Sequence, residues 1–208
     1  ARTANPDNIP NAGKVYIYTS GSSGWKQETI GSNQFISASD KVGDDQFGYS
    51  VAVNSDGNRI IVGAYNADFG VGIRSGKVYI YNSSSAGWKE EKIGSNQFIS
   101  ASDKVAGDIF GSSVAVNSAG SRIIVGAPGA DLASNLLGAG KVYTYYTTSS
   151  YVAKPHWDSP GGLDSSVYSI KQSGSDIYIG GQFTKDTGLT ETNTYKYFAK
   201  YSPEYDAF

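Results

Sequence analysis

An internal repeat constrains the fold of this chain more than any other feature of its sequence. The segment that begins at Gly13 begins again at Gly76, 63 residues later, and Gly-Lys-Val-Tyr-Ile-Tyr opens both copies. The stretch 30–42 returns unchanged as 93–105, and a third copy opens at Gly140 before it diverges. A repeat of this period is typical of an array of supersecondary units, each of which buries its apolar faces against its neighbours.

Each copy shows the pattern of short antiparallel strands. From Lys14 the apolar and aromatic residues follow period two, which indicates a strand. Two apolar runs, 51–53 and 59–64, flank the pair Asp56-Gly57, and Asp-Gly supplies the positive φ angles of a tight hairpin. A further strand begins at Trp25, and nothing in the unit has helical periodicity. The sequence therefore predicts an all-β fold, with four antiparallel strands in each unit, as in a blade of a β-propeller.

Two short motifs occupy fixed places around the hairpins in both copies. Phe47-Gly48 precedes the first apolar run and Val62-Gly63-Ala64 ends the second, and Phe110-Gly111 and Val125-Gly126-Ala127 occupy the same places in the second copy. These motifs resemble the FG-GAP repeat, and the resemblance covers about residues 13–146. It implies a β-propeller of the kind found in large bacterial, environmental and viral surface proteins. It says little about function, because one fold supports many functions.

The chain changes character from Tyr151 onward. A strand pattern at 167–171 is followed by a Ser-Gly-Ser-Asp turn, by Ile-Tyr-Ile-Gly-Gly at 177–181, and by Phe-Ala-Lys-Tyr at 198–201. This order is similar to kelch-like propeller repeats. We therefore expect four parts: an irregular lead-in at 1–12, FG-GAP-like blades at 13–146, a junction at 147–155 and a kelch-like blade at 156–208.

The predicted strands are too few to close a propeller. They amount to about three blades, whereas closed propellers usually have four to eight. We expect an incomplete ring that belongs to a larger propeller or that several chains complete together. The absence of Met, even at position 1, favours a part of a longer protein.

Composition excludes several classes of function. The net charge is −2 and the chain has no basic block, which argues against binding to nucleic acid. No apolar run approaches the roughly 20 residues that span a bilayer. The chain has no Cys, so it can form neither disulfides nor a thiol nucleophile.

Calcium is the first ligand that the resemblance implies, because many FG-GAP repeats carry a calcium loop in the hairpin. Such a loop needs several oxygen ligands, mostly carboxylates. Here the loop at 54–58 contains one carboxylate, Asp56, which Ala119 replaces in the second copy. We therefore predict plain turns and no cofactor, with Ca²⁺ as the alternative.

A second group of carboxylates offers weaker candidates for a metal site. Asp45 and Asp68 lie in the first copy, close to Asp44 in sequence order, and Asp108 and Asp131 occupy the same positions in the second copy. Capping of backbone amides in loops is the favoured role for these side chains.

No residue stands out as catalytic. His156 is the only His, and its neighbours on a strand would point to the opposite face. We therefore predict no catalytic residue and no enzyme. Asn82 begins an Asn-Ser-Ser sequon and is a candidate for glycosylation.

Alternating tyrosines mark the strand that opens each copy. Packing between blades is the favoured role for them, and an exposed ladder for sugar or protein contact is the alternative. The residues concerned are Tyr16, Tyr18, Tyr79, Tyr81, Tyr143 and Tyr145.

These observations predict a structural or adhesive propeller module of a larger extracellular, cell-surface or virion-surface protein. Its partners would be protein or glycan ligands and neighbouring blades or subunits. The loops at 65–75 and 128–139 differ most between the copies, so we expect them to be presented for contact. The alternatives are a glycan-binding lectin propeller and a carboxylate-based hydrolase or lyase.

Overall fold

The computed structural model describes residues 1–70, 73–131, 138, 140–147, 151–155, 167–173, 176–181 and 198–201. Within these ranges the chain forms one short 3-10 helix and thirteen strands, and no α-helix, which confirms the all-β class. The elements are η1 Pro6–Asn8, β1 Tyr18–Gly21, β2 Gly24–Gln27, β3 Ser50–Val53, β4 Arg59–Ala64, β5 Lys77–Ser84, β6 Gly87–Glu90, β7 Ser113–Val116, β8 Arg122–Ala127, β9 Lys141–Thr147, β10 Tyr151–Pro155, β11 Val167–Ser173, β12 Asp176–Gly181 and β13 Phe198–Tyr201.

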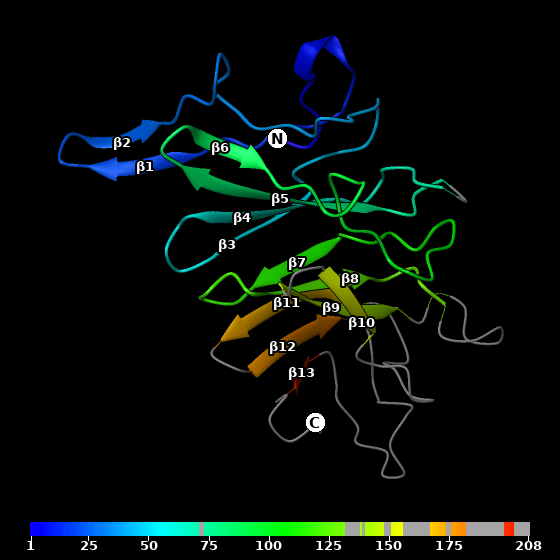
Figure 1. Cartoon of the computed structure of the whole chain (residues 1–208). Helices are drawn as coiled ribbons and strands as arrows, with labels where there is room; N and C mark the ends of the chain where they lie inside the picture. The colour runs from blue at the N-terminus through cyan, green and yellow to red at the C-terminus, as the bar shows by residue number, and fades with distance from the viewer. Residues whose placement is uncertain are drawn as a thin grey trace.

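The strands form separate antiparallel sheets that follow one another along the molecule (Figure 1). Their orders are β1-β2, β3-β4-β5-β6, β7-β8-β9-β10 and β11-β12-β13. Strand β7 contacts both β3 and β11, so the first strands of the three larger sheets come together. This is the arrangement of propeller blades around an axis, and the sheets do not close into a ring.

The start of the first copy differs from the prediction. The regular strand begins at Tyr18, and before it Val15 forms only an isolated bridge with Ile36. In the second copy the equivalent segment is the long strand β5, which pairs with β4 from Lys77 onward. The described part of the chain holds no strand in the position of β4 beside residues 15–18, so this segment lacks the partner that extends β5.

The fourth strand of the second blade comes from the segment that we predict to be a junction. Tyr151–Pro155 pairs with β9 in antiparallel register, from Tyr151 opposite Thr147 to Pro155 opposite Tyr143. The strand that we expect to begin at Trp157 lies outside the described residues, as does His156.

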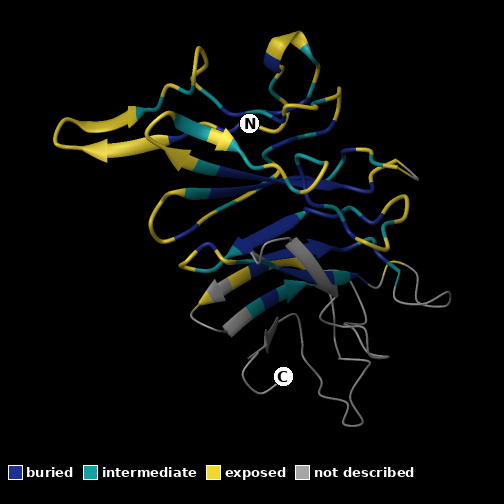
Figure 2. Cartoon of the chain, viewed as in Figure 1, coloured by how far each residue is buried: buried dark blue, intermediate teal, exposed yellow. Residues whose placement is uncertain are grey.

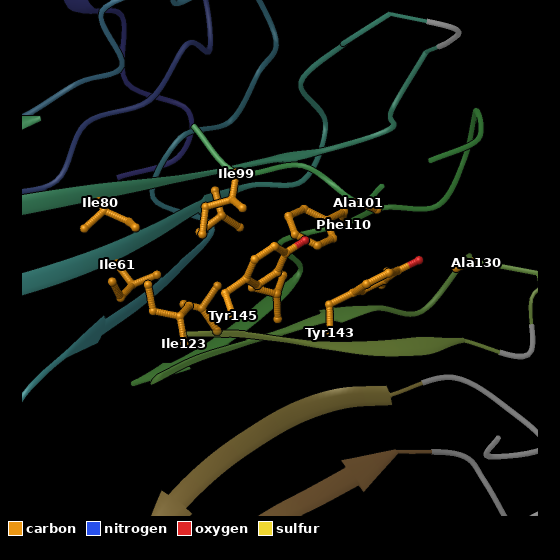
Figure 3. Close-up of a cluster of buried hydrophobic side chains, with 13 residues drawn as sticks. Ile61, Ile80, Ile99, Ala101, Phe110, Ile123, Ala130, Tyr143 and Tyr145 are labelled. Carbon is orange, nitrogen blue, oxygen red and sulfur yellow. The ribbon is translucent and has the colours of Figure 1, made fainter. Parts of the chain in front are cut away.

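Both faces of the central strands are buried, as the continuous apolar runs predict (Figure 2). On β4, Ile60 and Val62 belong to one apolar cluster and Ile61 belongs to another. The first interblade core lies between residues 15–47 and the sheet β3–β6. The second interblade core lies between the sheets β3–β6 and β7–β10, where Ile61 meets Ile123 (Figure 3).

The same aromatic contact forms in both cores. The ring centroid of Phe47 lies 5.4 Å from that of Tyr79 in the first core, and Phe110 lies 5.4 Å from Tyr143 in the second. Both pairs are edge-to-face, the arrangement that aromatic quadrupoles favour. All four side chains have no exposed area, so the burial of each phenylalanine contributes about 1.5–3 kcal/mol.

A glycine is required at the point where each blade turns into its third strand. Gly76 has φ 85°, and a Cβ atom there would lie 2.0 Å from the carbonyl oxygen of Phe110. Gly13 stands in the same relation to Phe47. Only glycine combines this left-handed backbone with so close an approach.

The first twelve residues share a pattern of hydrogen bonds with the described part of the loop after β4. The amide of Gly13 donates to the carbonyl oxygen of Ala4 at 2.9 Å, as that of Gly76 donates to Ala67 at 2.9 Å. Asn5 Oδ1 accepts the amide of Asn11 at 2.9 Å, and the equivalent Asp68 Oδ1 accepts that of Arg74 at 2.8 Å. The segment that we predict to be an irregular lead-in therefore repeats the hydrogen bonds that close the loop after β4. Sequence comparison misses it because few side chains are shared.

Candidate functional site

The two loops that diverge between the copies follow β4 and β8 and emerge at the same end of the sheets (Figure 1). Loop 65–75 is hydrogen-bonded to the segment before β7: the amide of Gly107 donates to Ile73 at 3.0 Å, and that of Ile109 donates to Arg74 at 3.1 Å. On its other side, Asn66 Nδ2 donates to the carbonyl oxygen of Asp44 at 2.6 Å. We define the loop face as residues 43–46, 65–75, 106–109 and 128–139, of which 71, 72, 132–137 and 139 are outside the described ranges.

Asp45 and Asp108 lie at the base of the loop face and cap backbone amides. Asp45 Oδ2 accepts the amide of Val42 at 2.8 Å, and Asp108 Oδ2 accepts that of Val105 at 2.6 Å. Both residues are buried. Burial raises the pKa of each carboxyl above its usual value, against the opposing effect of the accepted amide.

Asp68 and Asp131 cap the divergent loops themselves. Asp68 Oδ1 accepts the amide of Arg74, and Asp131 Oδ1 accepts the amide of Gly138 at 2.7 Å. All four candidate carboxylates therefore have the capping geometry that we favour from the sequence. After burial, the charge of Asp68 contributes to the raised pKa of Asp45, and the charge of Asp131 contributes to that of Asp108.

In the described ranges, no three side chains of His, Cys, Asp or Glu approach closely enough to form a metal site. In the first hairpin the side chain of Asn54 fills the loop. Its Oδ1 accepts the amides of Asn58 at 3.1 Å and Arg59 at 2.9 Å. The second hairpin repeats one of these bonds, from the amide of Arg122 to Asn117 Oδ1 at 2.9 Å. These turns are held by their own side chains.

A polar contact that sequence reasoning missed joins successive units. Asp40 accepts hydrogen bonds from Lys77 Nζ at 2.9 Å and from Tyr79 Oη at 2.7 Å. Burial, together with the charge of Asp40, raises the pKa of Tyr79 far above its usual value, so its hydroxyl remains a donor. The sequence did carry a signal for this contact. Residues 30–42 recur unchanged as 93–105, and their aspartate lies in neither a predicted hairpin nor a predicted strand that would explain why it recurs.

The second junction repeats this contact. Asp103 accepts hydrogen bonds from Lys141 Nζ at 2.6 Å and from Tyr143 Oη at 2.7 Å. Burial alone would raise the pKa of Asp103, but these two donors outweigh it and hold the pKa below its usual value.

Backbone strain occurs at the loop face. Ile109 has φ 59°, an outlier for a β-branched side chain, and the equivalent Gln46 has φ 56°. Hydrogen bonds hold both positions, since the amide of Gln46 donates to Asn11 at 3.0 Å just as that of Ile109 donates to Arg74. The segments that support the loops are therefore fixed by their neighbours.

A cavity of about 290 Å³ lies at the first strands of the three larger sheets. Its lining consists of residues 51–53 on β3, residues 114–116 on β7, and Ile170 and Lys171 on β11. The lining is mainly valine and alanine and contains no carboxylate.

The tyrosine pairs fall into two groups. Tyr79, Tyr81, Tyr143 and Tyr145 are buried between blades, as the favoured interpretation predicts. Tyr16 and Tyr18 are 41% and 53% exposed, and Trp25 on the same hairpin is 76% exposed. The first copy therefore carries an exposed aromatic surface that the second copy buries.

Asn82, the glycosylation candidate, lies on β5 and is half-buried. Its Nδ2 atom, which a glycan would modify, donates to Glu91 Oε2 at 2.7 Å.

The sheets and loops described above define a segment of β-propeller blades. Residues 31–81 and 94–145 match the family described as FG-GAP repeat. These two segments, about half of the chain, are FG-GAP repeats. No curated protein matches the chain as a relative. The kelch-like character that we expect after residue 155 remains a prediction.

The geometry explains the pairing of motifs that names the repeat. The amide of Gly48, which follows Phe47, donates to the carbonyl oxygen of Gly63 at 3.1 Å, and the amide of Gly111 donates to Gly126 at 3.0 Å. The Phe-Gly and Gly-Ala elements thus close on each other within one blade. Separately, the described residues include no helix with the length and apolarity that crossing a membrane requires.

Proposed function

We propose that this chain is a non-enzymatic propeller module of a larger extracellular or virion-surface protein, and that its loop face presents residues 65–75 and 128–139 for contact with a protein partner. One observation carries the proposal. The two copies repeat the same buried contacts, whereas the two loops differ in sequence. In the described part of loop 65–75, Asp68, Ile73 and Arg74 are exposed, and the loop is hydrogen-bonded to the strained segment at Ile109. A rigid scaffold with divergent loops is a common way to build binding surfaces.

Two further observations support a role in binding over a role in catalysis. The capping carboxylates of the loop face are engaged with backbone amides. The described side chains that line the cavity at the inner strands are valine, alanine and isoleucine, with Lys171 as the one charged group.

A lectin is the second candidate, because Tyr18 and Trp25 form an exposed aromatic surface. Aromatic faces of this kind bind the apolar faces of sugars. This surface lies on the hairpin β1–β2, away from the loop face (Figure 2).

Loop exchange tests the proposal. A variant with residues 128–139 copied in place of 65–75 and the native chain are applied to an array of purified extracellular proteins and to a glycan array. We expect signals on the protein array that the exchange abolishes while the melting temperature stays within a few degrees. Glycan signals that Trp25→Ala abolishes and loop exchange leaves intact would instead establish the lectin.

A further inference from the structure

The junction between the two copies depends on four side chains of the second copy, on β5 and β6, which donate hydrogen bonds to acceptors in the first copy. Lys77 and Tyr79 bind Asp40, Tyr81 Oη donates to the carbonyl oxygen of Ser37 at 2.8 Å, and Trp88 Nε1 donates to Glu28 Oε2 at 2.5 Å. Because the donors are on one copy and the acceptors on another, these bonds fix how the two copies sit against each other.

The next junction uses the same positions. Lys141 and Tyr143 bind Asp103, and Tyr145 Oη donates to the carbonyl oxygen of Ser100 at 3.0 Å. The contact is therefore a property of the repeat and does not depend on one particular pair of blades.

The first copy carries the same four side chains without these acceptors, and Tyr18 Oη donates within its own hairpin, to Gln27 Oε1 at 3.2 Å. Lys14, Tyr16, Tyr18 and Trp25 stand 63 positions before Lys77, Tyr79, Tyr81 and Trp88. Tyr79 is fully buried, whereas Tyr16 is 41% exposed; Trp88 is half-buried, whereas Trp25 is 76% exposed. Lys14 lies over the ring of Phe35, with Nζ 4.1 Å from its centroid, and no described carboxylate pairs with it.

The backbone beside these side chains is also open. The amide of Lys14 donates to the carbonyl oxygen of Ala1 at 3.1 Å. This contact corresponds to the pairing of Lys77 with Ala64 in the second copy. In β5 the pairing continues through Tyr79 opposite Val62 to Asn82 opposite Arg59. No described strand continues it along residues 15–18, so this edge can accept a strand.

From these contacts we infer that the edge at residues 14–18, with the side chains of Lys14, Tyr16, Tyr18 and Trp25, is a docking surface for a further FG-GAP repeat. The partner's counterpart of β4 pairs antiparallel with residues 14–18. Its connecting segment places an aspartate between Lys14 and Tyr16, a backbone carbonyl at Tyr18, and a glutamate at Trp25.

The occupant is a repeat additional to the two in this chain, and a second copy of the chain does not fit. Both β4 and β8 already pair on their two edges. Asp40 and Asp103 are held by the donors of the following blade. The inference concerns the scaffold and uses no residue of loops 65–75 and 128–139, so its failure would leave the proposed function untouched.

A chain extended by one repeat tests the inference. Ala1 is equivalent to Ala64, so a copy of residues 13–63 joined directly before Ala1 continues the repeat in register. The tryptophan of the added copy is replaced by phenylalanine, and the chain is labelled with 5-fluorotryptophan. Trp25→Phe assigns the fluorine resonance of Trp25 in the native and extended chains.

We expect the Trp25 resonance of the extended chain to lose its solvent isotope shift and to become like that of Trp88. Tyr16→Phe should then change the unfolding equilibrium about tenfold or more in the extended chain and about twofold at most in the native chain. Asp40→Asn, made in the added copy alone, should remove most of that difference.

Three results would overturn the inference. The first is a Trp25 resonance that stays solvent-exposed in the extended chain, including the case in which the added copy remains unfolded. The second is an equal effect of Tyr16→Phe in both chains. The third is self-association of the native chain that Tyr16→Glu abolishes, which would make a second copy the occupant.

Discussion

The hydroxyl group of Tyr79 donates a hydrogen bond of 2.7 Å to Oδ1 of Asp40, which lies 39 residues earlier, in the connection between β2 and β3. The bond crosses from one repeat to the next, and the pair Tyr143 and Asp103 repeats it at 2.7 Å. Apolar packing alone is tolerant of small shifts between sheets. A charged hydrogen bond at the edge of the core adds a directional constraint, so this pair sets the position of each blade against its neighbour.

Tyr79→Phe measures the strength of this contact. Removing a hydrogen bond to a charged acceptor should lower the free energy of unfolding by about 1.5–3 kcal/mol, while the apolar packing of the ring remains. Urea denaturation checks the value. Tyr16→Phe is the matched control, because Tyr16 occupies the same position in the first copy and is exposed; its effect should stay within about 0.5 kcal/mol. Equal losses in the two variants would contradict this account.

The carboxyl groups of Asp103 and Asp45 should affect stability in opposite directions as the pH changes. The pKa of Asp103 is lowered in the folded state, so its contribution is present above its unfolded pKa of about 3.8 and is lost as the pH falls through the folded value. Asp103→Asn should therefore destabilise the protein at neutral pH, and the difference from the native chain should shrink in acid. Urea midpoints over a pH series measure it.

Asp45 has a raised pKa in the folded state, so the sign reverses. Its contribution is present below an unfolded pKa of about 3.8 and is lost as the pH rises through the higher folded value. Asp45→Asn keeps a side-chain oxygen for the amide of Val42 and removes the buried charge. It should match or exceed the native chain in stability at neutral pH and lose that advantage in acid. A loss at neutral pH as large as that of Asp103→Asn would refute the assignment.

Gly63→Ala tests the contact between the inner strands of adjacent blades. A Cβ atom at residue 63 would lie 2.0 Å from the carbonyl oxygen of Gly111 and 2.3 Å from Oγ of Ser50. The added methyl group should push the two blades apart and so lower the free energy of unfolding by about 1–3 kcal/mol. Thermal and urea unfolding check this value. Gly21→Ala is the control, because nothing lies within 4 Å of the added atom on that strand; comparable effects at the two positions would argue against close blade contact.

Calcium should leave the stability of the chain unchanged. A ligand that binds the folded state alone raises the melting temperature, by an amount that grows with the logarithm of its concentration once this exceeds the dissociation constant. The hairpin at 54–58 holds one carboxylate, and Asn54 already satisfies its amides. We expect equal melting temperatures in millimolar calcium and in chelator, by differential scanning calorimetry. A rise with calcium that Asp45→Asn or Asp68→Asn abolishes would instead establish a metal site at the loop face.

The elements that the sequence predicts well are those governed by neighbours along the chain. Asp56-Gly57 predicts the hairpin between β3 and β4, and the apolar runs at 60–62 and 123–125 predict the strands β4 and β8 with both faces buried. The start of the first copy is predicted less well, because residues 14–17 have the strand pattern but, among the residues that the structure describes, form only an isolated bridge at Val15. The capping role of Asp45 follows from local spacing, whereas the partner of Asp40 lies in another blade.

The sequence by itself determined the class of fold, the repeat and the position of the divergent loops, because periodicity and turn residues act over a few positions. Only the tertiary structure decided which equivalent residues are buried. Tyr16 and Tyr79 have the same local sequence, yet one is exposed and the other is sealed against Asp40. Burial depends on whether another blade covers the strand, and that contact joins residues about 40 positions apart. No local pattern carries that information.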